Sequence, residues 1–175
     1  MDATPPDPTA KTLRVGFGET KLGLALVALS EQGVAAILLG DDRPKLRRDL
    51  TDAFPGARLV DDEANLAATI AKIVALVAAP QRGHDLPLDL RGSDLERAVW
   101  DALRAIPSGE TRSYGALAKA LPLPATAQDV GAACASNVLA VAIPCHRVVK
   151  ADGSISGYRW GVARKRRLIN MEGVG

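Results

Sequence analysis

The sequence LRVGFGETKLGLALVALSEQGVAAILL, residues 13–39, decides the fold of the first half of this chain. It divides into three short apolar runs, Leu13–Gly18, Leu22–Leu29 and Gly33–Leu39. The links between them are short and contain polar and turn-forming residues, a pattern typical of consecutive antiparallel strands. We therefore predict a small three-stranded antiparallel sheet.

Two helical patterns follow these strands along the chain. Pro44–Phe54 has the periodicity of an amphipathic helix. Leu66–Ala79 predicts a second helix, which Pro80 ends because proline cannot continue a helical hydrogen-bond ladder. A sheet accompanied by helices predicts an α/β (α+β) fold for this half.

The chain is expected to divide at a proline-containing linker. We expect a disordered segment over residues 1–11, an N-terminal α/β domain over 12–80, a linker over 81–92 and a C-terminal domain over 93–175. The first segment is rich in Pro and Asp and lacks the apolar core of a signal peptide. The linker reads as extended chain.

The second half is mainly helical. Ser93 and Glu96 form a capping-box pattern, in which each side chain can bond the backbone N–H of the other residue, and a helix follows until Pro107. Ser113 is suited to cap the next helix. Further helices are predicted at Tyr114–Leu121, Thr126–Ser136 and Val162–Met171. The two short helices around the break after Leu121 are consistent with a helix-turn-helix.

An apolar run, Leu139–Val149, interrupts these helices and contains Pro144, Cys145 and His146. We interpret it as a buried β-like segment. The residues after it, 151–161, contain several Gly and Ser and predict a loop.

Composition and charge exclude some classes of protein. The chain has 175 residues, a net charge of +2 and two cysteines, too few for a disulfide-stapled scaffold or an all-cysteine zinc site. Residues 1–90 carry 10 basic and 13 acidic side chains, whereas residues 91–175 carry 12 basic and 7 acidic ones. A basic second half permits a polyanionic partner there, although a solvated surface has the same pattern.

The pair Cys145-His146 can carry nucleophilic chemistry. A thiolate attacks far better than a thiol, and a nearby imidazole can take the thiol proton directly or through one water. Glu172 is a candidate to orient the imidazole. A buried structural cysteine beside a surface histidine remains the alternative.

Other residues that could carry chemistry have simpler interpretations. Cys134 lies on a helix rich in small residues and is expected to pack in the core. His84 lies in the linker and is expected to be solvated, as is the basic cluster 164–167. Gly16-x-Gly18 lacks the third glycine and the following helix of a dinucleotide-binding turn.

A resemblance to a known family makes the prediction specific. Residues 143–149, Ile-Pro-Cys-His-Arg-Val-Val, resemble the Pro-Cys-His-Arg-Val signature of the O6-alkylguanine-DNA alkyltransferases. Residues 100–114, Asn137, the loop 153–161 and Glu172 resemble further family motifs. The likeness is strong over 91–173, weaker over 12–90, and greatest to the carboxyl half of the bacterial Ada-type proteins, without their zinc domain.

The resemblance implies a role for each site residue. Cys145 would accept the alkyl group, His146 would take its proton through a water, Glu172 would hold His146, and Asn137 would support the turn that carries the cysteine. Tyr114 would push the target nucleotide out of the helix and donate a hydrogen bond to the base. The other residues expected to bind the substrate are Val148, Gly157, Tyr158, Arg159 and Trp160.

The resemblance also implies where DNA would bind. The expected DNA contacts are Ser113, Thr126, Ala127, Gln128, Gly131, Ala132 and Arg147. The family usually has an arginine where this chain has Gln128, and Asp129 follows it, which should weaken binding to duplex DNA. Trp160 is expected to narrow the mouth of the pocket against bulky alkyl groups.

The predicted function is therefore repair of DNA by direct reversal. One alkyl group, chiefly methyl, would pass irreversibly from O6-alkylguanine, and also from O4-alkylthymine, to Cys145, because the base can be reached once it is flipped out. We expect no cofactor and no metal, a cytoplasmic monomer that can act cooperatively on double-stranded DNA, and no membrane. The alternatives are a non-catalytic lesion sensor, against which Cys145 argues, a helix-turn-helix regulator, and a cysteine hydrolase.

Overall fold

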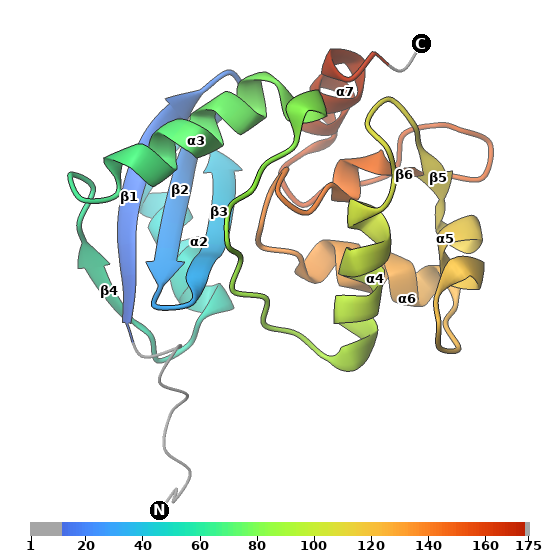
Figure 1. Ribbon diagram of the computed structural model, residues 1–175, viewed down its shortest axis with the longest axis horizontal. Coiled ribbons are helices and arrows are strands. Elements are labelled where there is room, and N and C mark those ends of the chain that lie inside the picture. Colours follow the sequence, from blue (N-terminus) through green and yellow to red (C-terminus); the bar gives the residue numbers. More distant parts are fainter. Residues whose placement is uncertain (1–11, 174–175) are drawn as a thin grey trace, which may run out of the picture.

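The computed structural model describes residues 12–173, and its elements form two groups along the chain (Figure 1). The predicted disorder at residues 1–11 lies outside the described residues. Within 12–173, no helix is both long and apolar enough to cross a membrane.

The first group contains the sheet. Strands β1 (Thr12–Thr20), β2 (Gly23–Ser30) and β3 (Gly33–Gly40) pair antiparallel in sequence order, which confirms the predicted meander. A fourth strand, β4 (Arg58–Asp61), pairs parallel to β1, with Thr12 opposite Arg58. The sheet order is β3-β2-β1-β4.

The prediction of a three-stranded antiparallel sheet is therefore wrong in the number of strands and in the direction of one of them. Only Leu59 and Val60 are apolar in β4, so the segment is too short to show an alternating pattern. Its partner β1 lies more than forty residues earlier in the chain. No local signal in the sequence reports such a pairing.

Two helices cover the sheet, with α3 in front of it and α2 behind it in the view of Figure 1. Helix α2 (Arg43–Ala53) begins at Asp42, whose carboxylate accepts the Lys45 N–H. Helix α3 (Ala67–Ala78) buries an apolar face against β1.

Two glycines of β1 let α3 approach closely. A Cβ atom at Gly16 or Gly18 would lie 2.8 or 2.6 Å from atoms of Ile70. Close packing of α3 against β1 therefore explains the two glycines, which in sequence resemble part of a nucleotide-binding turn.

The second group is helical, as predicted. Helix α4 (Asp94–Arg104) starts with the capping box of Ser93 and Glu96. Helix α5 (Tyr114–Ala120) is capped by Ser113. Its other elements are α6 (Ala127–Ser136), α7 (Val162–Met171), and the parallel pair β5 (Arg112–Ser113) and β6 (Val148–Val149).

The prediction of a β-like segment over Leu139–Val149 is wrong for most of its length. The run is buried as predicted, but it forms tight turns, a short 3-10 helix η2 (Cys145–Arg147), and only then β6. Val141 has φ = 67°, and Pro144 follows three residues later. Both residues disrupt regular strand pairing, and apolar composition alone does not reveal that.

The two groups meet along the outer edge of β3. The Ile37 N–H donates to the Val138 carbonyl at 2.8 Å, and the Ala140 N–H donates to the Ile37 carbonyl at 3.0 Å. Farther along, Val34 exchanges two backbone hydrogen bonds with the segment after the short 3-10 helix η1 (Pro80–Arg82), through Pro87 and Asp89. This edge strand is thus covered, and the segment before Cys145 is fixed to the sheet.

Candidate active site

Cys145 lies at the start of η2, and the residue is only 3% exposed. It nevertheless lines a hollow of about 350 Å³, together with Tyr114, Gly131, Cys134, Ala135, Gly157, Tyr158 and Arg159. The hollow is walled by α5, α6 and the loop that follows β6. It thus brings together Cys145 and five residues that the sequence predicted to bind the substrate or DNA: Tyr114, Gly131, Gly157, Tyr158 and Arg159.

Asn137 fixes the turn that carries Cys145. It is the C-cap residue of α6, and its side-chain N–H groups donate to the Ile143 carbonyl at 3.2 Å and to Cys145 Sγ at 3.3 Å. Its Oδ1 accepts the Leu139 N–H at 2.8 Å. One buried amide therefore holds both ends of the turn and the sulfur itself.

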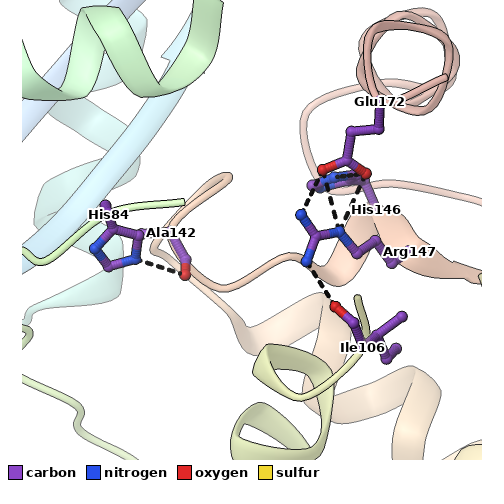
Figure 2. Close-up of polar contacts among 6 residues, drawn as sticks. All are labelled: His84, Ile106, Ala142, His146, Arg147 and Glu172. Atoms are coloured by element: carbon purple, nitrogen blue, oxygen red, sulfur yellow. Dashed lines mark hydrogen bonds and ion pairs between the residues drawn. The ribbon is translucent and has the colours of Figure 1, made fainter. Parts of the chain in front are cut away.

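His146, Glu172 and Arg147 form a buried cluster below the end of α7 (Figure 2). His146 Nε2 lies 3.0 Å from Glu172 Oε1. The Arg147 guanidinium donates to both oxygens of the same carboxylate, and its Nη1 donates to the Ile106 carbonyl at 2.8 Å. The carboxylate thus holds an imidazole and a guanidinium at once.

The protonation of this cluster follows from its surroundings. Burial by itself would raise the pKa of Glu172, but hydrogen bonds from His146 and Arg147 outweigh it and lower that pKa to about 2. Burial lowers the pKa of His146 below its ordinary value of 6.5, against the opposing effect of Glu172. At neutral pH the imidazole is therefore neutral and the carboxylate is charged.

The tautomer of His146 follows as well. A charged carboxylate can only accept, so Nε2 must carry the proton that it donates to Glu172. Nδ1 then has a free lone pair, and this buried atom has no hydrogen-bond partner within the described part of the chain. It is available to receive a proton.

The thiol needs such an acceptor. Burial raises the pKa of Cys145 to about 11, although the Asn137 hydrogen bond and the positive charge of Lys165 act in the opposite direction. At neutral pH the sulfur is protonated, and reaction requires loss of that proton.

Two residues that line the hollow, Tyr114 and Gly157, are joined by a chain of polar contacts through Ser156 and Lys165. The Tyr114 hydroxyl is hydrogen-bonded to Ser156 Oγ at 2.5 Å, and the Lys165 ammonium donates to the same Ser156 Oγ at 2.9 Å and to the Gly157 carbonyl at 3.3 Å. Burial raises the pKa of Tyr114 above its ordinary value, so the phenol stays protonated and can donate.

Lys165 was missed by the sequence reasoning, which treated the cluster 164–167 as a solvated face. The prediction is wrong for this residue, because Lys165 is fully buried. Its neighbour Arg164 is also engaged, donating to the Leu22 carbonyl at 2.7 Å and to Asp41. The available signal was helical spacing, since Lys165 shares the apolar face of Leu168 and Ile169.

The expectation that Arg147 contacts DNA is wrong in this structure. Its side chain is bonded to Glu172 and to the Ile106 carbonyl and is 9% exposed as a residue. A guanidinium held by a buried carboxylate cannot reach a phosphate without breaking that pair.

Cys134 does not simply pack in the core. It is partly exposed and lines the same hollow as Cys145. Burial raises its pKa to about 12, above that of Cys145, and the proximity of Cys145 adds to this. The Cys134 thiol is therefore protonated at neutral pH, like that of Cys145.

Trp160 and Val148 do not line the hollow. Trp160 is buried, packs edge-on against the Tyr158 ring with centroids 5.3 Å apart, and faces a separate hollow beside Asp41 and Leu46. The prediction that Trp160 narrows the pocket mouth is therefore wrong, and the side chain packs against Tyr158 instead. Val148 is fully buried in β6.

The remaining residues expected to bind DNA lie at the start of α5 and along α6 from its N-cap to Ala132. Ser113 and Thr126 are the N-caps of these helices, and Ala127, Gln128 and Ala132 are exposed on α6. Arg159 ties the loop to this helix, because its Nη1 donates to the Ala135 carbonyl at 2.7 Å.

His84 is not solvated as predicted. It is half-buried, and its ring is hydrogen-bonded to the Ala142 carbonyl and to the Leu86 N–H (Figure 2). The linker residue thus touches the segment that leads to Cys145.

Known proteins share this sequence and arrangement. A family model described as the DNA-binding domain of 6-O-methylguanine DNA methyltransferase matches residues 94–174. The methylated-DNA–protein-cysteine methyltransferase of Methanosarcina acetivorans is 32% identical over 155 residues, which are 89% of this chain and 95% of that protein. The chain belongs to the methylated-DNA–protein-cysteine methyltransferase family. The resemblance drawn from the Pro-Cys-His-Arg-Val motif is thereby confirmed.

Members of this methyltransferase family differ in length. The bifunctional transcriptional activator/DNA repair enzyme Ada of Escherichia coli is 44% identical over 160 residues, which are 91% of this chain but 45% of that protein. The chain thus spans about half the length of the Ada proteins it matches.

Solved structures of the family share the fold. The O6-methylguanine methyltransferase of Mycobacterium tuberculosis superposes with a TM-score of 0.74 at 29% identity, covering 91% of this chain and 92% of that one. A second structure of that protein, in complex with DNA, gives a TM-score of 0.73 at 30% identity and covers 92% of each chain.

Proposed function

We propose that this protein repairs alkylated DNA by moving one alkyl group, chiefly methyl, from O6 of guanine to Cys145. The observation that carries the proposal is a buried thiol at the wall of an open hollow, held by Asn137 and adjacent in sequence to the His146–Glu172 pair. Family membership supports it. O4-alkylthymine presents the same kind of alkyl–oxygen bond and is a second substrate on this proposal.

The reaction balances with the groups in the hollow and those behind it. Sγ forms a bond to the alkyl carbon while the bond from that carbon to O6 breaks, and the electron pair stays on the base. The thiol proton passes from Cys145 Sγ to His146 Nδ1, directly or through one bridging water. Glu172 stabilises the imidazolium that results. The guanine anion gains a proton in turn, with the Tyr114 phenol as a hydrogen-bond donor.

No group of the described residues is arranged to cleave the resulting thioether. A thioether is a stable product, so each chain would act once. The base must leave the duplex to reach the sulfur, because the reacting carbon cannot be approached within stacked DNA.

The DNA would bind along α5 and α6, which form the helix-turn-helix of this proposal. Ser113 and Thr126 cap the starts of these helices, and α6 presents small residues that let a duplex approach. Residues 12–80 and 93–175 then act as two domains joined by 81–92. Such a repair protein would work as a monomer on double-stranded DNA in the cytoplasm.

A single incubation tests the proposal. The protein is mixed with a duplex that contains one O6-methylguanine, and its intact mass and peptide map are measured. We expect one methyl group per chain, on Cys145, in the wild type and in Cys134→Ser, and none in Cys145→Ser. Methyl on Cys134, repeated turnover, or an unmodified wild type would refute it.

A further inference from the structure

The segment that presents Cys145 contains two consecutive tight turns. The Ala142 N–H donates to the Ala140 carbonyl at 2.7 Å, which closes a three-residue turn centred on Val141. The Cys145 N–H donates to the Ile143 carbonyl at 2.8 Å, which closes a second such turn centred on Pro144. The position of the thiol therefore depends on the geometry of both turns.

The first turn is in an unfavourable conformation. Val141 has φ = 67°, and it is the sole non-glycine residue with positive φ within residues 12–173. A β-branched side chain is strongly disfavoured there, and a γ-turn of this hand is rare. Such a conformation persists only when its surroundings hold it, and it is found preferentially at functional sites.

Three groups outside the two turns hold this segment. Asn137 bonds the Leu139 N–H and the Ile143 carbonyl, and the Ile37 carbonyl of β3 accepts the Ala140 N–H. The third group is His84, whose Nε2 lies 3.1 Å from the Ala142 carbonyl oxygen, 58 residues away in sequence (Figure 2). Of the three, His84 bonds the residue that directly follows Val141, through the carbonyl of Ala142.

The hydrogen bonds of His84 define its tautomer. Nδ1 accepts the Leu86 N–H at 3.1 Å and is therefore unprotonated. Nε2 must then carry the proton and donate it to Ala142. The neutral ring bridges the linker backbone and the strained turn, and both of its nitrogens are used.

A hollow borders the turn on the side of His84, although Val141 and Ala142 are themselves buried. This hollow of about 190 Å³ lies beside His84, Val141, Ala142 and Pro144, and Arg104 and Arg147 also line it. Few atoms therefore press on the turn from here, so a directional hydrogen bond has more influence than it would in a filled core.

We propose that His84 is a positioning residue for alkyl transfer. By holding the Ala142 carbonyl it keeps Val141 in its strained conformation and so keeps the Cys145 thiol aimed into the hollow. This inference rests on the proposed function for its DNA readout, but it also predicts the reactivity of the thiol without DNA.

Two substitutions separate the two hydrogen bonds of the ring. In His84→Gln, the amide nitrogen stands at the same number of bonds from Cβ as Nε2 and can donate to Ala142. In His84→Asn, the amide oxygen stands where Nδ1 was and can accept the Leu86 N–H, as in an Asx-turn, but the side chain is too short to reach Ala142.

The experiment measures single-turnover transfer at saturating DNA, DNA affinity, and the rate at which iodoacetamide alkylates Cys145, mapped by peptide mass. For His84→Asn we expect the rates of methyl transfer and of iodoacetamide alkylation to fall by about 3- to 10-fold, which corresponds to the loss of one hydrogen bond. The affinity for DNA should not change. For His84→Gln we expect both rates to stay near those of the wild type. Exchange of the Ala142 and Cys145 amide protons, followed by NMR, should be faster in His84→Asn alone.

Two outcomes would overturn the inference. Wild-type rates and amide exchange in His84→Asn would show that the bond does not position the thiol. Equal losses in both variants would show that the ring matters by packing. If the wild type transfers no methyl group at all, the proposed function fails, whereas the iodoacetamide and exchange measurements still decide the role of His84.

Discussion

At the scale of single residues, the site depends on one carboxylate that serves two partners. Glu172 holds neutral His146 in the tautomer that leaves Nδ1 free, and it neutralises the buried Arg147 guanidinium. Removing a charge from one member of a buried pair leaves the other uncompensated, which costs more than the pair contributed. Glu172 should therefore matter for both stability and transfer.

Replacing Glu172 with Gln tests this double role. The amide keeps the size of the side chain but loses the negative charge that faces His146 and Arg147. We expect a loss of about 1–3 kcal/mol in the free energy of unfolding at neutral pH, together with slower transfer. Urea titration and single-turnover rates measure the two effects, and a variant as stable and as fast as the wild type would remove Glu172 from both roles.

Lys165 carries a positive charge that acts on the Cys145 thiol. Its positive charge lowers the pKa of Cys145, against the larger effect of burial. In Lys165→Gln we expect that pKa to rise beyond its wild-type value of about 11, so the iodoacetamide reaction of Cys145 should move to higher pH. Arg166→Gln, which changes an exposed neighbour on the same helix, is the matched control and should leave the profile in place. The same profile in Lys165→Gln would contradict the prediction.

At the scale of elements, Asp129 of α6 stabilises the start of its helix but places a negative charge where the phosphates of DNA are proposed to bind. Asp129 completes a capping box with Thr126: the Asp129 N–H donates to Thr126 Oγ1 at 3.1 Å, and the Thr126 N–H donates to Asp129 Oδ2 at 2.8 Å. The cap explains why an acidic residue occupies the first turn of a helix proposed to face DNA. Beside it, exposed Gln128 offers no cation.

Two substitutions of Asp129 separate the cap from the charge. Asp129→Asn keeps an acceptor for the Thr126 N–H, whereas Asp129→Ala loses it and should destabilise the protein by about 0.5–2 kcal/mol. Both remove a charge that repels phosphate, so both should tighten binding to duplex DNA, and Gln128→Arg should tighten it further by adding a phosphate contact and steepening the salt dependence. Melting curves and fluorescence anisotropy across a salt series test this, and unchanged affinity in all three variants would show that α6 does not face DNA.

At the scale of the whole molecule, the sheet takes part in the site although none of its residues lines the hollow beside Cys145. Ile37 of β3 exchanges two backbone hydrogen bonds with Val138 and Ala140, and Arg164 of α7 reaches back to Leu22 and Asp41. The active turn is thus built on the edge of the sheet. Conditions that loosen the molecule as a whole should also loosen the site.

Acid is such a condition, because the pKa values of His146 and Glu172 are both lower in the folded protein than in the unfolded chain. The pKa of His146 lies below its ordinary 6.5 in the folded protein, so the unfolded chain binds a proton first and stability begins to fall below that pH. The pKa of Glu172 falls from an ordinary 4.5 to about 2 on folding, so its contribution is present above pH 4.5 and is lost as the pH falls toward 2. Both groups therefore lower the free energy of unfolding in acid.

We therefore expect the unfolding free energy of the wild type to fall in two stages between pH 7 and pH 2. Glu172→Gln should lack the lower stage, so its stability should approach that of the wild type as the pH nears 2. Urea titrations at a series of pH values measure both curves. Parallel curves over the whole range would show that the Glu172 carboxylate does not titrate with folding.

The sequence by itself determined the features that depend on neighbouring residues. Capping residues such as Ser93 and Ser113 started their helices where predicted, and the runs at 13–39 formed β1 to β3. These signals are local, because a cap or an alternating strand satisfies backbone groups only a few residues away. The motif around Cys145 likewise identified the family.

Only the tertiary structure decided which distant groups meet. Basic side chains differ in their surroundings: Arg147 was expected at the DNA but is bonded to Glu172, and Lys165 is buried while Arg166 on the same helix is exposed. The same holds for β4, which pairs with a strand more than forty residues away, and for His84, which bonds Ala142 across 58 residues. Such contacts depend on how the whole chain folds back on itself, so no local pattern of residues encodes them.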